Sequence, residues 1–213
     1  MITILDFHTH RLDAAQALIS VSPRDFEPQP GLYYSLGYHP WLDPETLTED
    51  DFSLLEERTL HPQVLAIGEA GLDTLRGGDL KLQEAVFAHH LRLAAQLHKP
   101  VVVHCVRTSQ QILAIRRREG LTAVPLAIHG MRGNEHVARA WLEDGCYLSY
   151  GARFNPAAVE VTPRDRLLIE TDEAHETIQE VAAMIADVLN CSADEVMALT
   201  AANALRLLTS QDK

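Results

Sequence analysis

The sequence predicts an α/β fold of the (β/α)₈ TIM-type barrel class, because short apolar, β-branched runs alternate with longer amphipathic segments. This alternation is typical of strands and helices that build a parallel sheet. Eight segments have the character of strands: 3–8, 17–21, 33–38, 64–68, 100–104, 125–129, 146–150 and 167–170. The barrel is expected to be compressed, since the 213 residues fall below the ~250 typical of this fold.

Helices are predicted where apolar residues recur at helical spacing between the later strands. The segment 80–97 shows this spacing through Leu82, Val86, Leu93 and Leu97. Ser192, followed three residues later by Glu195, has the pattern of a capping box that opens a helix. The predicted helices are 80–97, 109–119, 135–143, 178–189 and 193–208.

The first third of the chain departs from this alternation of strands and helices. Only six residues separate His10 from Ala17, and the stretch from Ser22 to Gly31 is rich in proline and turn-forming residues. We therefore expect the first helices of the barrel to be missing or reduced. The region between residues 11 and 32 would then change the mouth of the barrel.

Composition indicates one globular domain over residues 1–213, with 46% hydrophobic and 23% charged residues. No apolar run approaches the ~20 residues that cross a bilayer, and Met1 to Asp6 offers neither a basic leader nor a cleavage site. We expect a cytoplasmic protein that does not enter a membrane. The net charge of −12 weighs against non-specific binding to duplex nucleic acid and is compatible with a monomer.

His8 and His10 form a His-x-His pair at the end of the first predicted strand. Residues two apart in a strand point to the same face, so both imidazoles can reach one point inside the barrel mouth. Such a pair taken alone is also compatible with ordinary packing or surface exposure. Its interpretation depends on the residues that end the other strands.

Four more residues of metal-ligand type end predicted strands: Glu69, His104, His129 and Asp172. The carboxyl ends of barrel strands meet at one face, which carries the active site. Each residue alone could be a buried histidine or a helix cap, but burying all of them together without a cation would be costly. Six mixed nitrogen and oxygen ligands suit one or two divalent ions and favour two, with zinc or manganese more natural than magnesium.

Arginines follow the same strand ends, at Arg11, Arg107, Arg132 and Arg153. Guanidinium groups bind phosphate oxygens in bidentate fashion, so an acidic protein could carry a basic mouth. The alternative is that these arginines pair with nearby carboxylates. His39 and Trp41, on the loop after the third predicted strand, could contact a base or ring, although Trp41 could equally pack at the rim.

In order along the chain, these motifs resemble those of the TatD-type metal-dependent hydrolases, a branch of the amidohydrolase barrels. The resemblance rests on Asp6-Phe7-His8-Thr9-His10, Gly37-Tyr38-His39-Pro40-Trp41, Ile67-Gly68-Glu69-Ala70-Gly71-Leu72-Asp73, Pro100 to Arg107, Ile128 to Gly133, and Leu168-Ile169-Glu170-Thr171-Asp172, and it extends to the ending Asn203 to Leu207.

The resemblance implies a dinuclear site in which His8, His10 and Asp172 hold one ion, His104 and His129 hold the other, and Glu69 bridges them. It also implies deoxyribonuclease activity, chiefly 3′ to 5′ exonuclease, with some relatives acting on small esters or amides. Two motifs differ from the usual pattern: His129 to Gly133 replaces His-x-Phe-Ser-Gly, and no proline follows Ala174.

The expected chemistry is metal-assisted hydrolysis of a phosphodiester in DNA ends, single-stranded DNA or a small phosphorylated substrate. A water bridging two ions would lose its proton more easily, and the hydroxide would attack phosphorus. Asp172, the candidate to take that proton, and Glu69 are the predicted catalytic residues, and His39, Arg107, Arg132 and Arg153 the predicted substrate-binding residues. The alternatives are a hydrolase of a small ester, lactone or amide, and a non-catalytic metal-binding module.

Overall fold

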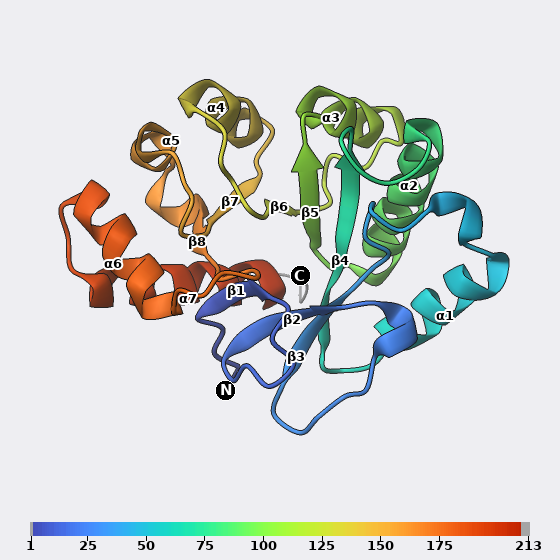
Figure 1. The fold of residues 1–213 in the computed structure, drawn as a ribbon, viewed down its shortest axis with the longest axis horizontal. Coiled ribbons are helices and arrows are strands. Elements are labelled where there is room, and N and C mark those ends of the chain that lie inside the picture. Colours follow the sequence, from blue (N-terminus) through green and yellow to red (C-terminus); the bar gives the residue numbers. More distant parts are fainter. Residues whose placement is uncertain (1, 210–213) are drawn as a thin grey trace. The chain divides into compact units, whose positions relative to one another are not determined.

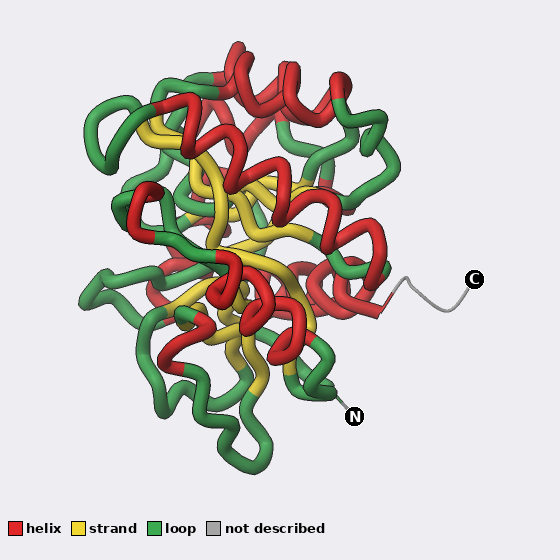
Figure 2. The backbone as a smooth tube through the Cα atoms, turned by 90° about the vertical axis from the view of Figure 1, so that its right-hand side faces the viewer, coloured by secondary structure: helices red, strands yellow, loops and turns green. Residues whose placement is uncertain are grey.

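The structure is a computed structural model that describes residues 2–209, with the remaining terminal residues drawn in grey in Figure 2. The described chain has eight strands in one parallel sheet, and their order in the sheet is their order in the sequence. The strands are β1 (Asp6–Thr9), β2 (Ala17–Val21), β3 (Tyr33–Leu36), β4 (Val64–Asp73), β5 (Val101–Val106), β6 (Leu126–Ile128), β7 (Tyr147–Tyr150) and β8 (Leu167–Ile169) (Figure 1).

The first and last strands of this sheet are also neighbours. Thr9 of β1 forms a parallel bridge with Asp172, just after β8, and the Asp172 amide donates a hydrogen bond to the His8 carbonyl over 2.9 Å. A parallel sheet in chain order whose first strand meets its last is the arrangement of a (β/α)₈ barrel. The predicted fold class is confirmed.

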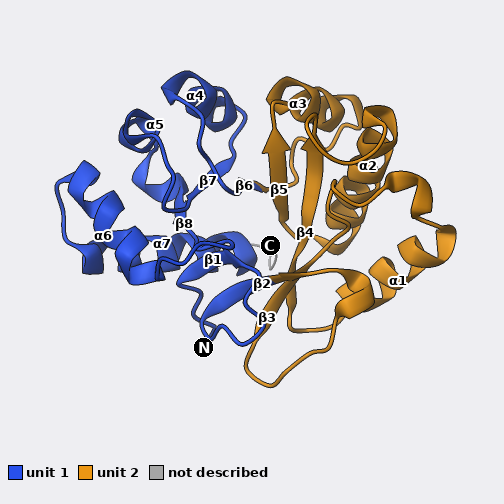
Figure 3. Ribbon diagram, in the orientation of Figure 1, with its two compact units in different colours: residues 1–19, 127–213 blue, residues 20–126 orange. Residues whose placement is uncertain are grey.

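The chain divides into two compact units, shown in different colours in Figure 3. Unit 1 comprises residues 1–19 and 127–213, so it joins the first strand to the segment from residue 127 onwards. Unit 2 comprises residues 20–126 and holds β3, β4 and β5. The expected single domain over residues 1–213 stays a prediction.

The five predicted helices are present with bounds that differ by at most one residue. They are α2 (Leu80–Leu97), α3 (Ser109–Arg118), α4 (Glu135–Glu143), α6 (Ile178–Leu189) and α7 (Ala193–Thr209). The Ser192–Glu195 capping box is formed, since the Ser192 amide and hydroxyl both donate to Glu195 and the Glu195 amide donates back to Ser192 Oγ. Among the described helices, none is long and apolar enough to cross a membrane.

Two helices escaped prediction: α1 (Glu49–Thr59) and α5 (Pro156–Val161). In α1 only Leu55 and Thr59 are buried, so the helix lacks the apolar stripe on which such a prediction depends. Its start is fixed by a capping box between Thr48 and Asp51. The six residues of α5 are too few to show a period.

The expected shortening at the start of the barrel is confirmed. Over the described residues before α1 the connections contain only short 3₁₀ turns, η1 (Pro23–Asp25) and η2 (Pro44–Thr46). A third such turn, η3 (Arg164–Arg166), precedes β8. Polar and proline-rich segments of this kind bury too little apolar surface to hold a covering helix.

Strand β4 corrects the prediction that a strand ends at Gly68. It continues to Asp73, because pairing with β5 resumes after a register shift and runs from Ala70 opposite Val103 to Asp73 opposite Val106. Glu69 therefore lies inside the strand. Gly71 permits this pairing, since a Cβ there would collide with the His104 carbonyl oxygen.

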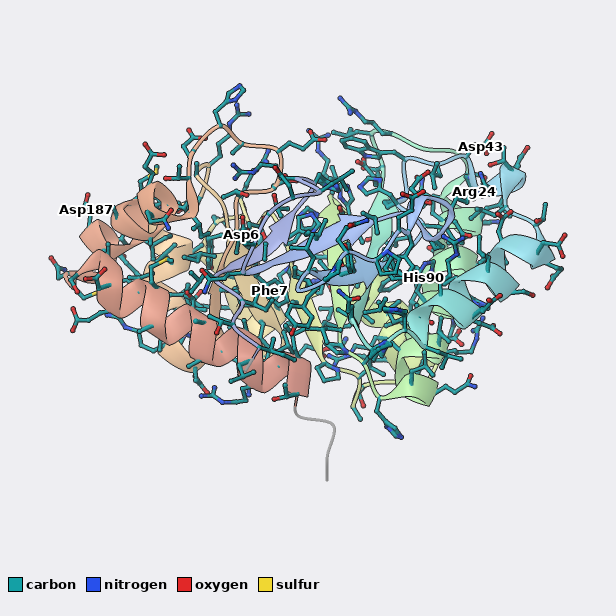
Figure 4. The ribbon with its side chains drawn as sticks, turned by 90° about the horizontal axis from the view of Figure 1, so that it is seen from below. Asp6, Phe7, Arg24, Asp43, His90 and Asp187 are labelled. Atoms are coloured by element: carbon teal, nitrogen blue, oxygen red, sulfur yellow. The ribbon has the colours of Figure 1, made fainter. Side chains whose placement is uncertain are left out.

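A buried histidine on α2 supports the end of β3. The His90 side chain is fully buried; its Nδ1 lies 2.8 Å from the Val86 carbonyl, and its Nε2 accepts a hydrogen bond from the Tyr38 amide over 3.0 Å. His90 belongs to unit 2 and is labelled in Figure 4. Burial lowers the pKa of His90 from 6.5 to about 4, so the ring is neutral at pH 7 and fixes the backbone beside His39.

This lowered pKa predicts a loss of stability in mild acid. Below pH 6.5 His90 is protonated in the unfolded chain, whereas in the folded chain it stays neutral down to about pH 4. The unfolded state therefore binds more protons in this range, and the free energy of unfolding falls as the pH falls. Between neutral pH and about pH 5 the contribution of His90 is about 2 kcal/mol. Urea unfolding across this range should show a shallower pH slope in His90→Gln, whereas the exposed control His136→Gln should keep the original slope. Equal slopes in both variants would contradict the assignment.

Candidate metal centre

In unit 1, the end of β1 and the segment after β8 bring His8, His10 and Asp172 together. One ligand atom of each lies within 4.8 Å of the others. The Asp172 carboxylate Oδ1 is 3.8 Å from His8 Nε2 and 3.6 Å from His10 Nε2. These separations exceed a hydrogen bond. They approach the roughly 3.4 Å between ligands that share one tetrahedral ion at about 2.1 Å. The donor set therefore fits a borderline divalent ion.

The backbone of Asp172 is held in an uncommon conformation. Its φ is 53°, in the left-handed region that non-glycine residues enter at a cost of about 1 kcal/mol. The Asp172 amide donates to the His8 carbonyl, and Thr9 Oγ1 donates to the Asp172 carbonyl over 3.3 Å. These contacts with β1 hold the carboxylate in front of the two histidines.

The Asp6 carboxylate fixes the segment that carries Asp172. It is buried within unit 1, where Figure 4 labels it on β1 beside Phe7. It accepts hydrogen bonds from the Thr171 amide over 2.9 Å and from Thr171 Oγ1 over 2.6 Å. Burial raises the pKa of Asp6 to about 6, although the two Thr171 bonds act in the opposite direction. Asp6 thus positions residues of the site without reaching it.

His129 lies in the same unit, directly after β6. Its ring centroid is 4.2 Å from that of His8, and its Nδ1 lies 3.5 Å from Oε1 of Glu170. Glu170 is fully buried, and its Oε1 also accepts the Gly130 amide over 2.5 Å. A buried carboxylate beside one nitrogen of a histidine orients the other nitrogen, which is a common arrangement behind metal ligands.

In unit 2, Glu69 on β4, His104 on β5 and His39 after β3 form a second group of ligand type. Glu69 Oε1 is 2.7 Å from His104 Nδ1 and 2.9 Å from His39 Nε2, and these two nitrogens are 3.2 Å apart. One carboxylate and two imidazoles are a donor set that suits zinc or manganese. His39, predicted to bind substrate, therefore lies among the predicted metal ligands.

Asp73 stands behind this group on the side of His104 away from Glu69. The carboxylate Oδ2 is 3.2 Å from His104 Nε2 and accepts the Trp41 indole N–H over 2.6 Å. Burial acts to raise the pKa of Asp73, but hydrogen bonds from Trp41, the Leu75 amide and His104 outweigh it and leave the pKa below its ordinary value. Asp73 is therefore an anionic acceptor at neutral pH.

The predicted substrate-binding arginines are exposed. In the described part of the chain, Arg107, Arg132 and Arg153 form no ion pair with a carboxylate of the unit to which each belongs. Arg11 lines a pocket of unit 1 with a volume of about 430 Å³, together with His10, Asp172, Glu173, Ala174 and His175. Guanidinium groups that are not neutralised by carboxylates can receive an anionic ligand.

Sequence reasoning overlooked several residues of these groups. Asp73 and Glu170 stood in the quoted motifs, but only their contacts with His104 and His129 reveal a role. His175 was overlooked as a lining residue of the pocket. The available signal for Asp6 was a carboxylate inside the apolar run Ile4-Leu5-Asp6-Phe7, because a carboxylate buried in a strand needs donors.

The family profile described as "TatD related DNase" matches residues 24–209, which is most of the chain. The chain belongs to the TatD family. Among curated proteins it is similar to the uncharacterized metal-dependent hydrolase YabD of Bacillus subtilis, with 32% identity over 83% of this chain and 77% of that protein. It is also similar to the 3′-5′ ssDNA/RNA exonuclease TatD of Cronobacter turicensis, with 35% identity over 67% of this chain and 57% of that protein.

The crystal structure of YjjV, a TatD homologue from Escherichia coli K12, has the same fold. The TM-score is 0.80 at 22% identity, and the match covers 98% of this chain and 99% of that one. A TatD-family protein of Entamoeba histolytica matches with a TM-score of 0.73 at 18% identity, over 84% of this chain and 75% of the other. The chain is thus a metal-dependent hydrolase of the TatD family with candidate His, Glu and Asp ligand groups.

The contact between Asp6 and Thr171 predicts a specific stability effect. Thr171→Val keeps the shape of the side chain but removes the hydroxyl that donates to Asp6, leaving a buried carboxylate with one donor fewer. The free energy of unfolding should fall by roughly 1–3 kcal/mol, the cost of such a loss at a charged acceptor. Thr209→Val, at an exposed helical position, is the matched control in urea unfolding. A loss no larger than that of the control would show that Thr171 does not hold Asp6.

Proposed function

We propose that this protein is a divalent-metal-dependent phosphodiesterase that acts on DNA ends or single-stranded DNA, with 3′ to 5′ exonuclease character. The observation that carries the proposal is the presence of two groups of imidazole and carboxylate ligands in a chain of the TatD family. A relative from Cronobacter turicensis, named a 3′-5′ ssDNA/RNA exonuclease, supports this substrate class.

The proposal assigns two divalent ions, zinc, manganese or magnesium, to the six ligands predicted from the sequence. His8, His10 and Asp172 would hold one ion, and His104 and His129 the other, with Glu69 shared. His39 is close enough to Glu69 and His104 to contribute a further nitrogen. The ions would activate water and offset the negative charge that develops on a phosphodiester.

Asp172 is the proposed general base. Its carboxylate is partly exposed and lines the pocket of unit 1, so water can reach it, unlike the buried carboxylates of Asp6 and Glu170. The backbone contacts with β1 hold the carboxylate at a fixed place, which favours proton transfer because little reorganisation is required.

Substrate binding is assigned to His39 and the exposed arginines Arg107, Arg132 and Arg153. The net charge of −12 would repel a polyanion at long range, so a phosphate must be held by local contacts. Bidentate bonds from guanidinium groups supply such contacts and favour a short or single-stranded end over a long duplex.

Activity on a short single-stranded oligonucleotide should depend on both metal and Glu69. Removing metal with a chelator should abolish nucleotide release, and adding Mn²⁺ or Zn²⁺ should restore it. Glu69→Gln should lower kcat/KM by at least about 10²-fold, because it removes a ligand charge at the reacting centre. Chromatography of released nucleotides gives the measurement, with Glu57→Gln, an exposed change on α1, as the control.

No cleavage of single-stranded or duplex DNA under any divalent metal would contradict the nuclease assignment. Metal-dependent activity on small esters, lactones or amides in the same preparation would then identify the alternative substrate class. That outcome would leave the ligand assignment intact.

Metal content gives a separate test of the two-ion assignment. Elemental analysis of protein purified without chelator and reloaded with Zn²⁺ should give about two ions per chain. His10→Ala, which removes one ligand of the unit 1 group, should reduce the content towards one ion, because the ligands assigned to the other ion, His104, His129 and Glu69, remain. An unchanged content in His10→Ala would contradict the role of that histidine.

A further inference from the structure

The Asp73 carboxylate is one of the most completely bonded groups in unit 2. It is 3% exposed, and its Oδ1 accepts the amides of Leu75 over 2.7 Å and Arg76 over 3.1 Å. The backbone of Asp73 is held in turn by the buried Gln83 side chain, which accepts the Asp73 amide and donates to the Asp73 carbonyl. The direction of Oδ2 is therefore fixed.

Oδ2 faces two nitrogens whose protons can be assigned from chemistry alone. The Trp41 indole nitrogen is only ever a donor, so Oδ2 is an acceptor in that 2.6 Å bond. A carboxylate has no proton to offer His104 Nε2 at 3.2 Å, so Nε2 must carry the hydrogen. This holds whether the ring is neutral or positively charged, because both forms then have N–H at Nε2.

The hydrogen on Nε2 determines what Nδ1, the other nitrogen of the His104 ring, can do. Nδ1 lies 2.7 Å from Glu69 Oε1 and 3.2 Å from His39 Nε2, and an ion bound by Glu69 would take the place of any hydrogen on Nδ1, whereas Nε2 keeps the hydrogen that Asp73 accepts. A metal ion is bound by the unprotonated nitrogen of histidine. The ring thus presents its ligand atom towards the Glu69 group and its N–H towards Asp73.

We propose that Asp73 is a positioning residue that locks His104 into the tautomer with hydrogen on Nε2, so that Nδ1 is the ligand atom. This inference rests on the proposed metal site and adds to it a residue that contacts no ion. Trp41 contributes from the surface, since its indole N–H occupies the same carboxylate oxygen and limits rotation of the group.

Asp73→Asn provides a sharp test because it changes one side-chain atom. The asparagine oxygen can still accept the Leu75 and Arg76 amides, but an N–H₂ group then faces His104 Nε2 and Trp41 Nε1. A donor opposite Nε2 favours the reversed tautomer, with hydrogen on Nδ1 where the ion binds. Competition with a chelating dye should show Zn²⁺ affinity reduced by about 10- to 100-fold. Asp79→Asn, the same chemical change at the exposed cap of α2, should leave the affinity within threefold.

Nitrogen NMR of histidine-labelled, Zn²⁺-loaded wild-type protein tests the tautomer without any variant or activity. His104, assigned by comparison with His104→Gln, should show hydrogen on Nε2. An unprotonated Nε2, or a folded Asp73→Asn with wild-type Zn²⁺ affinity, would overturn the inference. Wild-type protein that binds Zn²⁺ with Nε2–H on His104 but cleaves no phosphodiester would support the inference and contradict the proposed function.

Discussion

The hydrogen-bonded pair of Asp6 and Thr171 is the constraint on which the unit 1 ligand group depends. Asp6 lies two residues before His8 on β1, and Thr171 directly precedes Asp172. Two short bonds between them join the first strand of the fold to the segment after the last. Burying the carboxylate is unfavourable, as its pKa of about 6 shows, and the bonds to Thr171 offset part of that cost. The buried Asp6 carboxylate thus costs stability, but its bonds to Thr171 fix the position of Asp172 beside the two histidines.

The same design recurs in unit 2 with other residues. Neither Asp6 nor Asp73 is assigned as a metal ligand. Asp6 binds the residue before the ligand Asp172, and Asp73 contacts the ring of the ligand His104. Glu170 beside His129 is a third case. Imidazole and carboxylate ligands need orientation as well as proximity, and a buried acceptor supplies orientation because its own donors are fixed.

The strands and the histidine positions could be predicted because both leave a local signal. The strands are short, continuous apolar and β-branched runs, and ligand-type residues end or interrupt them. The roles of Asp73 and Glu170 leave no such signal: Trp41 and Asp73 are 32 residues apart, and Gly130 and Glu170 are 40 apart. Helix α1 was overlooked for a related reason, since capping and packing of two residues fix it rather than an apolar stripe. Contacts between distant segments determine the roles of these residues, and the periodicity of the sequence does not reveal such contacts.

Trp41 connects the surface of unit 2 to the ligand group in its interior. Trp41 is 46% exposed, the Arg76 guanidinium lies 4.3 Å above its ring, and its indole nitrogen binds Asp73 in the interior. A base or ring that stacks on Trp41 competes with Arg76 for the indole face, whereas the indole edge stays bound. Displacing the whole side chain would instead remove a donor from the carboxylate that orients His104. Binding that keeps Trp41 in place is therefore the mode compatible with an ordered ligand group.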